Sequence, residues 1–258
     1  MAVSIHPLAV VDPAAVLGED VTVGPFCVVG PEAKIGDRAV LRSHVSVTGN
    51  TTLGAECEVW PFASVGGKTQ DLKYRGGSPR LVVGPRTVIR ECATLSCATY
   101  PEGETRVGAG CLLMAYCHVA HDCIVGDRVI MANNATLAGH VIVEDDAILG
   151  GMAGVHQFVR IGRMCILGGC TKAVKDVPPY MMADGDPVKV YGPNKVGLAR
   201  HNVTPEAQAA LKKAYKIVFH STDTVARALE RLETELPPLP EIRAYADFIR
   251  ASQRGIAR

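Results

Sequence analysis

Aromatic side chains are scarce in this sequence: they make up 5% of its 258 residues, although 48% of the residues are hydrophobic. A core with so few rings must be built from aliphatic and small side chains. No apolar run reaches the roughly 18 residues that a transmembrane helix needs, and the N-terminus lacks the basic and then apolar segments of a signal peptide. The sequence also lacks a large excess of positive or negative residues, since the net charge is +1. These absences argue against a transmembrane segment and against a nucleic-acid-binding surface.

Large aliphatic residues recur at every sixth position in two long runs. The first run is Val11, Leu17, Val23, Val29, Ile35, Leu41, Val47, Leu53, Val59 and Val65. The second run, which departs only at Met131, is Val107, Leu113, Val119, Val125, Met131, Leu137, Val143, Leu149, Val155, Ile161 and Leu167. A period of six fits neither the 3.6-residue period of a helix nor the alternation of a plain strand. It fits a triangular prism of short parallel strands, with about eighteen residues in each coil.

A second column of small residues lies four positions after each large aliphatic residue. Several of the nine cysteines fall in this column, namely Cys27, Cys57, Cys111, Cys117, Cys123 and Cys165. We interpret them as small hydrophobic groups inside the prism and not as metal ligands or disulfide partners. Free thiols and the lack of an export signal predict a cytoplasmic protein.

The pattern resembles the hexapeptide-repeat left-handed β-helix, and the left hand is implied by that resemblance alone. We therefore predict an all-β left-handed parallel β-helix over residues 1–186, followed by a small C-terminal α-helical domain over residues 187–258. Two insertions interrupt the repeat, near residues 66–80 and 97–106. Loops that leave a rigid solenoid commonly carry binding groups.

The C-terminal domain carries helix signals. Thr204 and Pro205 resemble an N-cap followed by proline in the first helical position. Asp223 is a candidate N-cap for a second helix, and a third helix is expected over about residues 241–252.

One corner of the prism is expected to gather polar groups. A step of eighteen residues leads from His121 to Gly139 and then to Gln157. His118, His140 and His156 lie within three residues of this column. Three interpretations compete: structural histidines that bond backbone carbonyls, a three-histidine zinc site of the kind that a class of hexapeptide carbonic anhydrases uses, or a histidine base for direct acyl transfer from a thioester.

The motifs favour acyl transfer. "HVAHDC", "NNATLAGHV", "VHQF" and "DVPPY", together with "QDLKY" in the first insertion, resemble the UDP-N-acetylglucosamine acyltransferases that begin lipid A synthesis. This resemblance covers nearly the whole chain. It implies transfer of an (R)-3-hydroxyacyl group from acyl carrier protein to the 3-hydroxyl of UDP-N-acetylglucosamine by a homotrimer, with no cofactor and no metal.

The resemblance also implies roles for individual residues. The catalytic positions would be His121 as general base, Asp122 as its orienting partner and Gly139 as the oxyanion donor. The substrate-binding positions would be Gln70, Asp71, Lys73, His118, His140, His156, Gln157, Asn194 and Arg200. Gly168 and Gly169 would lie where acyl-chain length is limited. Two departures weaken the match, "SCAT" at Ser96–Thr99 and His201 in place of a second basic residue.

Rival functions stay open at this point. The family includes N-acyltransferases that use a 3-amino sugar nucleotide, and a later N-acyltransferase of the same pathway carries an extra N-terminal domain for which this repeat leaves no room. A trimeric metal-dependent hydratase of the carbonic anhydrase type and a non-enzymatic solenoid are the more distant alternatives.

The paired glycines lead to a prediction about the donor. Because Gly168 and Gly169 leave space, a fairly long acyl chain is expected, and G169M should shift preference toward shorter chains. Transfer would be compared across 3-hydroxyacyl carrier-protein thioesters of graded length. An unchanged preference in the variant would contradict the assignment.

Overall fold

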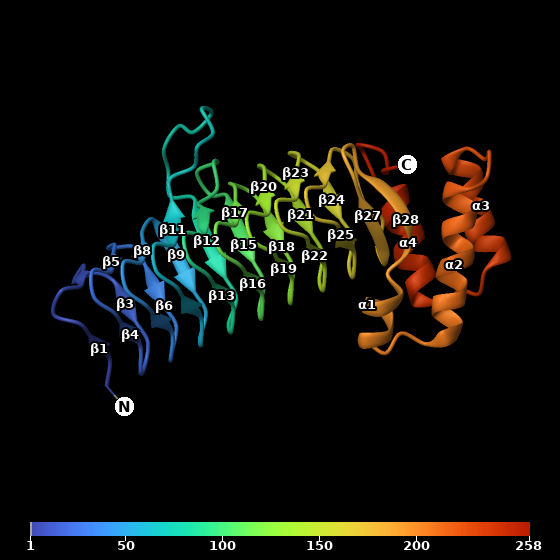
Figure 1. Ribbon diagram of the computed structural model, residues 1–258. Helices are drawn as coiled ribbons and strands as arrows, with labels where there is room; N and C mark the ends of the chain where they lie inside the picture. Colours follow the sequence, from blue (N-terminus) through green and yellow to red (C-terminus); the bar gives the residue numbers. More distant parts are fainter. Residues whose placement is uncertain (1) are drawn as a thin grey trace.

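Three parallel β-sheets form the walls of a long prism in the computed structural model, which describes residues 2–258 (Figure 1). Successive strands belong to successive sheets, so each coil contributes one strand to each wall. Thr136 pairs with His118, eighteen residues earlier, and with Gly154, eighteen residues later. The predicted β-helix with this coil length is confirmed.

The strands are short and follow the chain around the three walls. The first wall contains β1 (Ser4–Ile5), β4 (Thr22–Val23), β7 (Val40–Leu41), β10 (Glu58–Val59), β13 (Val88–Ile89), β16 (Leu112–Leu113), β19 (Ile130–Met131), β22 (Ile148–Leu149), β25 (Ile166–Leu167), β27 (Met181–Asp184) and β28 (Lys189–Pro193). The second contains β2 (Val10–Val11), β5 (Val28–Val29), β8 (Ser46–Val47), β11 (Ser64–Gly67), β14 (Thr94–Ser96), β17 (His118–Val119), β20 (Thr136–Leu137), β23 (Gly154–Val155) and β26 (Lys172–Ala173). The third contains β3 (Val16–Leu17), β6 (Lys34–Ile35), β9 (Asn50–Leu53), β12 (Arg80–Val83), β15 (Glu104–Val107), β18 (Ile124–Val125), β21 (Ile142–Val143) and β24 (Arg160–Ile161).

Both predicted columns point into the prism. Leu137 and Leu149 from the large column are fully buried, and so is Met131. The cysteines of the small column are buried too, and all nine cysteines are free. Burial raises the pKa of Cys117 to about 11 and that of Cys123 to about 12. These thiols therefore stay protonated and apolar, as the sequence predicts.

The corners of the prism use a left-handed backbone conformation that is rare outside glycine. Asp122, His140 and Phe158 have φ values of 59°, 61° and 65° and follow one another along one corner. This conformation costs roughly 1–2 kcal/mol per residue. Backbone hydrogen bonds between coils offset part of the cost, as from His140 N–H to the His121 carbonyl at 3.1 Å. The corner therefore holds its side chains in a fixed vertical series.

The two insertions lengthen single coils without disturbing the walls. Glu58 pairs with Val40 on one side and with Val88, thirty residues later, on the other. Val88 pairs in turn with Leu112, twenty-four residues later. The first insertion rises as a loop between β11 and β12 (Figure 1). The segments at both predicted interruptions lie mostly between strands, and the first wall continues past them.

The sheet extends past the boundary expected at residue 186. β28 lies antiparallel to β27 and closes the last coil. Four helices follow, namely α1 (Lys195–Arg200), α2 (Pro205–Phe219), α3 (Val225–Glu235) and α4 (Pro240–Arg250). Within residues 2–258, no helix is both long enough and apolar enough to cross a membrane.

Two of the three helix signals agree with the structure. Thr204 caps α2 by accepting a hydrogen bond from Ala207 N–H, with Pro205 in the first helical position. The α4 helix lies close to its expected range. The choice of Asp223 as an N-cap is wrong, because Thr224 caps α3 and Asp223 instead pairs with Arg231 at 2.7 Å. The sequence reasoning did not predict α1.

The packed interior predicts a large cost for removing an inward side chain. Leu137→Ala should lower the free energy of unfolding by about 2–5 kcal/mol, because the rigid coils cannot collapse into the cavity. Lys34→Ala, on an exposed strand position, should change it by about 0.5 kcal/mol or less. Guanidinium unfolding of both variants would test this, and equal losses would contradict the inward assignment.

Candidate active site

His121 and Gly139 occupy the same corner of neighbouring coils. A Cβ atom added to Gly139 would lie 2.4 Å from Cε1 and 2.6 Å from Nε2 of His121. These distances are far inside van der Waals contact, so only glycine fits beside this imidazole. The predicted neighbourhood of the two residues is confirmed.

The His121 ring is oriented by a carboxylate. Its Nδ1 lies 2.8 Å from Oδ2 of Asp122, and both side chains are largely buried. Asp122 also accepts hydrogen bonds from Thr99 N–H, at 3.2 Å on Oδ2 and 3.3 Å on Oδ1. A carboxylate at Nδ1 favours the tautomer with the proton there, which leaves a lone pair on Nε2. The corner therefore presents a basic nitrogen at a defined place.

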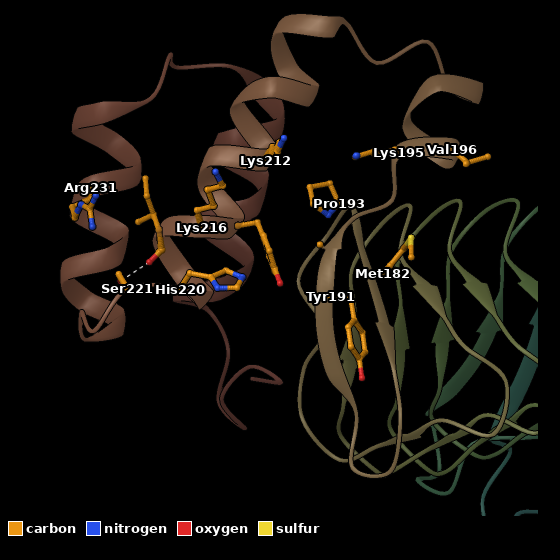
Figure 2. A pocket seen from close by; sticks show the side chains of 13 residues that line it. Met182, Tyr191, Pro193, Lys195, Val196, Lys212, Lys216, His220, Ser221 and Arg231 are labelled. Carbon is orange, nitrogen blue, oxygen red and sulfur yellow. Dashed lines mark hydrogen bonds between the residues drawn. The ribbon is translucent and has the colours of Figure 1, made fainter.

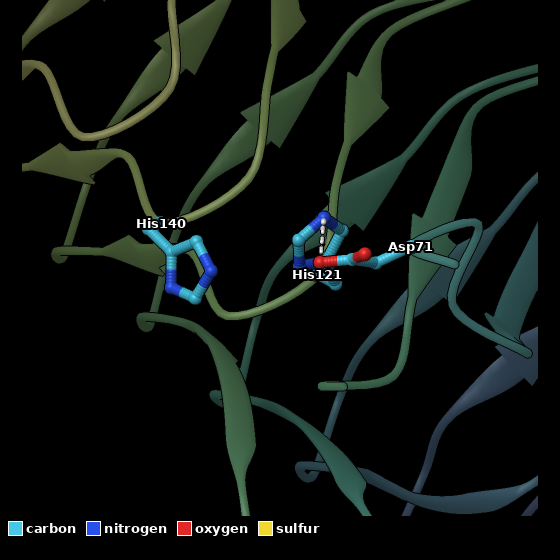
Figure 3. A group of neighbouring side chains, drawn as sticks. All are labelled: Asp71, His121 and His140. Atoms are coloured by element: carbon cyan, nitrogen blue, oxygen red, sulfur yellow. Dashed lines mark ion pairs between the residues drawn. The ribbon is translucent and has the colours of Figure 1, made fainter. Parts of the chain in front are cut away.

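His140 and Asp71 complete a cluster around this nitrogen (Figure 3). The His140 ring stacks on Phe158 and meets the His121 ring edge-on, with centroids 5.2 Å apart. Oδ2 of Asp71 lies 3.9 Å from Nε2 of His121. Burial, with the nearby His121 as a smaller cause, lowers the pKa of His140, whereas the backbone N–H of Lys73 lowers that of Asp71. The neutral imidazole of His140 and the ionised carboxylate of Asp71 thus both lie near Nε2 of His121.

The two insertions are joined beneath this cluster. The hydroxyls of Thr69 and Thr99 lie 2.8 Å apart, and Asp71 N–H donates to Thr69 Oγ1 at 3.1 Å. The "SCAT" segment, a departure whose effect the sequence left open, therefore supports Asp122 through the backbone N–H of Thr99. Every residue type except proline supplies that group, so this contact does not depend on the side chain at position 99.

Other predicted residues flank the cluster on the same side of the prism. His118 lies in β17, and His121 lies in the turn that follows this strand. The Nδ1 atom of His118 is 2.7 Å from Thr94 Oγ1. Burial lowers the pKa of His118. Gln70 and Lys73 are exposed on the first insertion, and His156 and Gln157 are exposed at the next coil. The structure thus places most of the predicted polar residues at one corner or beside it.

A cavity of about 560 Å³ beside His140 contains residues that the sequence reasoning missed. It is lined by His140, Ile142, Phe158, Arg160, Asp176, Ala251, Gln253 and Arg254. Arg254 Nη2 lies 3.4 Å from His156 Nδ1. The buried carboxylate of Asp176 holds this tail by accepting from Ser252 Oγ at 2.7 Å. No periodicity links the tail to the prism, so the sequence carried no signal for this contact.

Two predicted binding residues lie elsewhere in the chain. Asn194 is 2% exposed, caps α1 by accepting from Gly197 N–H, and donates to the Met164 carbonyl. Arg200 is exposed at the end of α1. This helix lies at the C-terminal end of the prism, away from the insertion loops (Figure 1).

The two glycines assigned to acyl length differ in their surroundings. A Cβ on Gly168 would lie 2.4 Å from the Asp184 carboxyl carbon, whereas one on Gly169 would meet only the Gly151 carbonyl, at 3.3 Å. Gly168 is therefore required by the packing of β27. Gly169 is the less crowded of the two, because a side chain there requires only a small shift of the Gly151 carbonyl.

A cavity of about 950 Å³ lies in the C-terminal region (Figure 2). It is lined by Met182, Tyr191, Gly192, Pro193, Lys195, Val196, Lys212, Tyr215, Lys216, Ile217, His220, Ser221 and Arg231. None of the predicted site residues lines it. It is therefore separate from the histidine corner.

Comparisons with known proteins agree with this geometry. Residues 14–49 and 104–139 match the bacterial transferase hexapeptide model, and residues 176–257 match the second domain of UDP-N-acetylglucosamine O-acyltransferase. The structure of LpxA from Acinetobacter baumannii is 41% identical, with both chains fully covered and a TM-score of 0.96. The chain belongs to the UDP-N-acetylglucosamine O-acyltransferase family.

Other members of this acyltransferase family have the same fold. LpxA from Moraxella catarrhalis is 40% identical over the full length of both chains, with a TM-score of 0.95. The Arabidopsis UDP-N-acetylglucosamine acyltransferase is 38% identical, over 98% of this chain and 100% of that one, with a TM-score of 0.88. The likeness to this family thus extends over both the prism and the helices.

Proposed function

We propose that this protein transfers an (R)-3-hydroxyacyl group from acyl carrier protein to the 3-hydroxyl of UDP-N-acetylglucosamine, the first step of lipid A biosynthesis. The observation that carries this proposal is the His121–Asp122 pair, which lies against a glycine corner in a member of the family. A thioester donor is already activated, so a single base suffices for direct attack by an alcohol.

His121 takes the proton in this mechanism. Its Nε2 accepts the hydrogen of the sugar hydroxyl as the oxygen attacks the thioester carbonyl carbon. Asp122 lies 2.8 Å from Nδ1 and stabilises the imidazolium that forms. The proton then passes to the leaving thiolate, which returns the base to its neutral state. Asp71 and His140 bind the acceptor sugar around the same nitrogen.

The Gly139 amide is suited to the developing negative charge. Within residues 2–258, no protein group accepts a hydrogen bond from its N–H. The missing side chain also leaves room beside His121. A free backbone N–H next to the base can stabilise the oxyanion of the tetrahedral intermediate, an effect worth about 10²–10³ in rate for one donor.

A homotrimer is part of this proposal. An apolar series follows one corner along the prism, with Phe26, Phe62, Tyr116 and Met152 between 52% and 63% exposed. An exposed apolar stripe of this length is typical of an interface.

Replacement of the base tests the function directly. Wild-type protein should transfer 3-hydroxyacyl groups from carrier-protein thioesters to UDP-N-acetylglucosamine, and His121→Ala should lower kcat by at least about a hundredfold. The control is His6→Ala, at an exposed histidine on the first coil that lies outside both the histidine corner and the apolar series. Undiminished transfer by His121→Ala would remove this mechanism, and transfer only to a 3-amino acceptor would reassign the substrate.

The Gly139 contact gives a steric test of the same site. Gly139→Ala should lower kcat to about the level of His121→Ala, because the new methyl group displaces the imidazole. Gly154→Ala is the matched control, since an added Cβ there meets nothing within 4 Å. Transfer assays and thermal unfolding of both variants would separate loss of the base from loss of the fold. Full activity of Gly139→Ala would contradict the placement of His121.

A further inference from the structure

The side chains that the proposed acyl transfer uses at the histidine corner also form a set of possible metal-donor atoms. One atom each from Asp71, His121 and His140 lie within 4.8 Å of one another, and the three side chains come from separate segments (Figure 3). The two histidines lie on adjacent coils of the rigid prism, and the aspartate lies on the first insertion. All three side chains are partly accessible to solvent.

Two imidazole nitrogens and one carboxylate oxygen are the protein ligands of an open tetrahedral zinc site, with the fourth position free for water or substrate. Zinc–ligand distances of about 2.0–2.1 Å place tetrahedral donors roughly 3.4 Å apart. The observed 3.9 Å between Asp71 Oδ2 and His121 Nε2 needs a closure of about half an ångström by that measure, and the other donor pairs, which lie within 4.8 Å, need a closure of up to about 1.4 Å. Asp71 lies on a loop, so it can supply this movement.

The surrounding groups orient the donors as metal sites require. Asp122 at the Nδ1 of His121 makes the carboxylate–histidine arrangement that directs the other nitrogen toward a metal. Oδ1 of Asp71 accepts from Lys73 N–H, which leaves Oδ2 facing His121. Phe158 fixes the ring plane of His140. Asp71 and Asp122 provide negative charge for a cation, and Lys73 is the nearby positive charge that opposes it.

We propose that Asp71, His121 and His140 form a binding site for a divalent cation of the zinc class, and that the bound cation inhibits the enzyme reversibly. The cation takes the Nε2 lone pair of His121 and the place of the acceptor hydroxyl, so inhibition competes with the sugar nucleotide. No covalent bond is made or broken. The inhibition depends on the proposed role of His121 as base, whereas the binding does not.

Binding is tested without any assay of activity. Cobalt(II) added to the wild-type protein should produce the visible absorption of a tetrahedral site with one ion per chain, and zinc should displace it. Asp71→Asn and His140→Asn should each weaken binding at least about tenfold, by analogy with the cost of disturbing metal-ligand shells. Size-exclusion chromatography and thermal unfolding would identify a misfolded variant. If one variant misfolds, the affinity of the other variant for cobalt tests the proposal.

Two controls address binding elsewhere on the protein. His6→Asn removes an exposed histidine from the first coil, and Cys170→Ser removes an exposed thiol. Neither should change the cobalt spectrum. The absence of a one-to-one complex with cobalt, or an affinity for cobalt in both Asp71→Asn and His140→Asn equal to that of the wild-type protein, would overturn the proposal.

The activity arm separates the two hypotheses. Zinc should raise the apparent KM for UDP-N-acetylglucosamine at unchanged kcat, and a chelator should restore the rate. A wild-type protein that binds cobalt at this site yet transfers no acyl group would refute the proposed function and leave the cation site in place. Binding without competition against the sugar nucleotide would refute the inhibitory role.

Discussion

Stacking of coils at a fixed step of eighteen residues is the constraint on which the rest of the structure depends. Parallel strands about 4.8 Å apart bring residue i of one coil directly over residue i + 18 of the next. His121, Gly139 and Phe158 belong to neighbouring coils for this reason, and their geometry follows from the register of β17, β20 and β23. A shift of the strand register by one residue would turn inward side chains outward, and His121 and Gly139 would no longer be neighbours.

The histidines of the site lie on the rigid prism, whereas the carboxylate of Asp71 lies on an insertion. The histidines project from corners whose backbone is bonded to the coil above and the coil below. The carboxylate of Asp71 comes from an insertion that is joined to the second insertion through Thr69 and Thr99. A rigid frame therefore positions the base, while a loop brings a ligand group to it. This division is common where loops on a scaffold carry function.

The C-terminal region covers the last coil of the prism, and its final residues contact the prism again beside the histidine corner. β28 and the helices cover the last coil, and the tail beyond α4 pairs with Asp176 next to the histidine corner. The buried Asp176 carboxylate binds both Ser252 Oγ and the backbone N–H of Arg160. Arg254 is thereby held against His156, so the last residues of the chain shape the surface next to the cluster.

The six-residue repeat was enough to predict the prism, its coil length, the inward cysteines, the two insertions and the proximity of His121 to Gly139. It could do so because a strict repeat converts distance along the chain into position in space, whereas the hand of the β-helix came from family resemblance alone. Contacts that no repeat encodes became visible only in the folded chain, namely Thr99 with Asp122, Asp71 with His121, and Arg254 with His156. These contacts join segments outside the repeat, whose paths depend on packing between distant residues. The sequence also did not identify Thr224 as the N-cap of α3, because the carboxylate of Asp223 forms an ion pair with Arg231 in the folded chain.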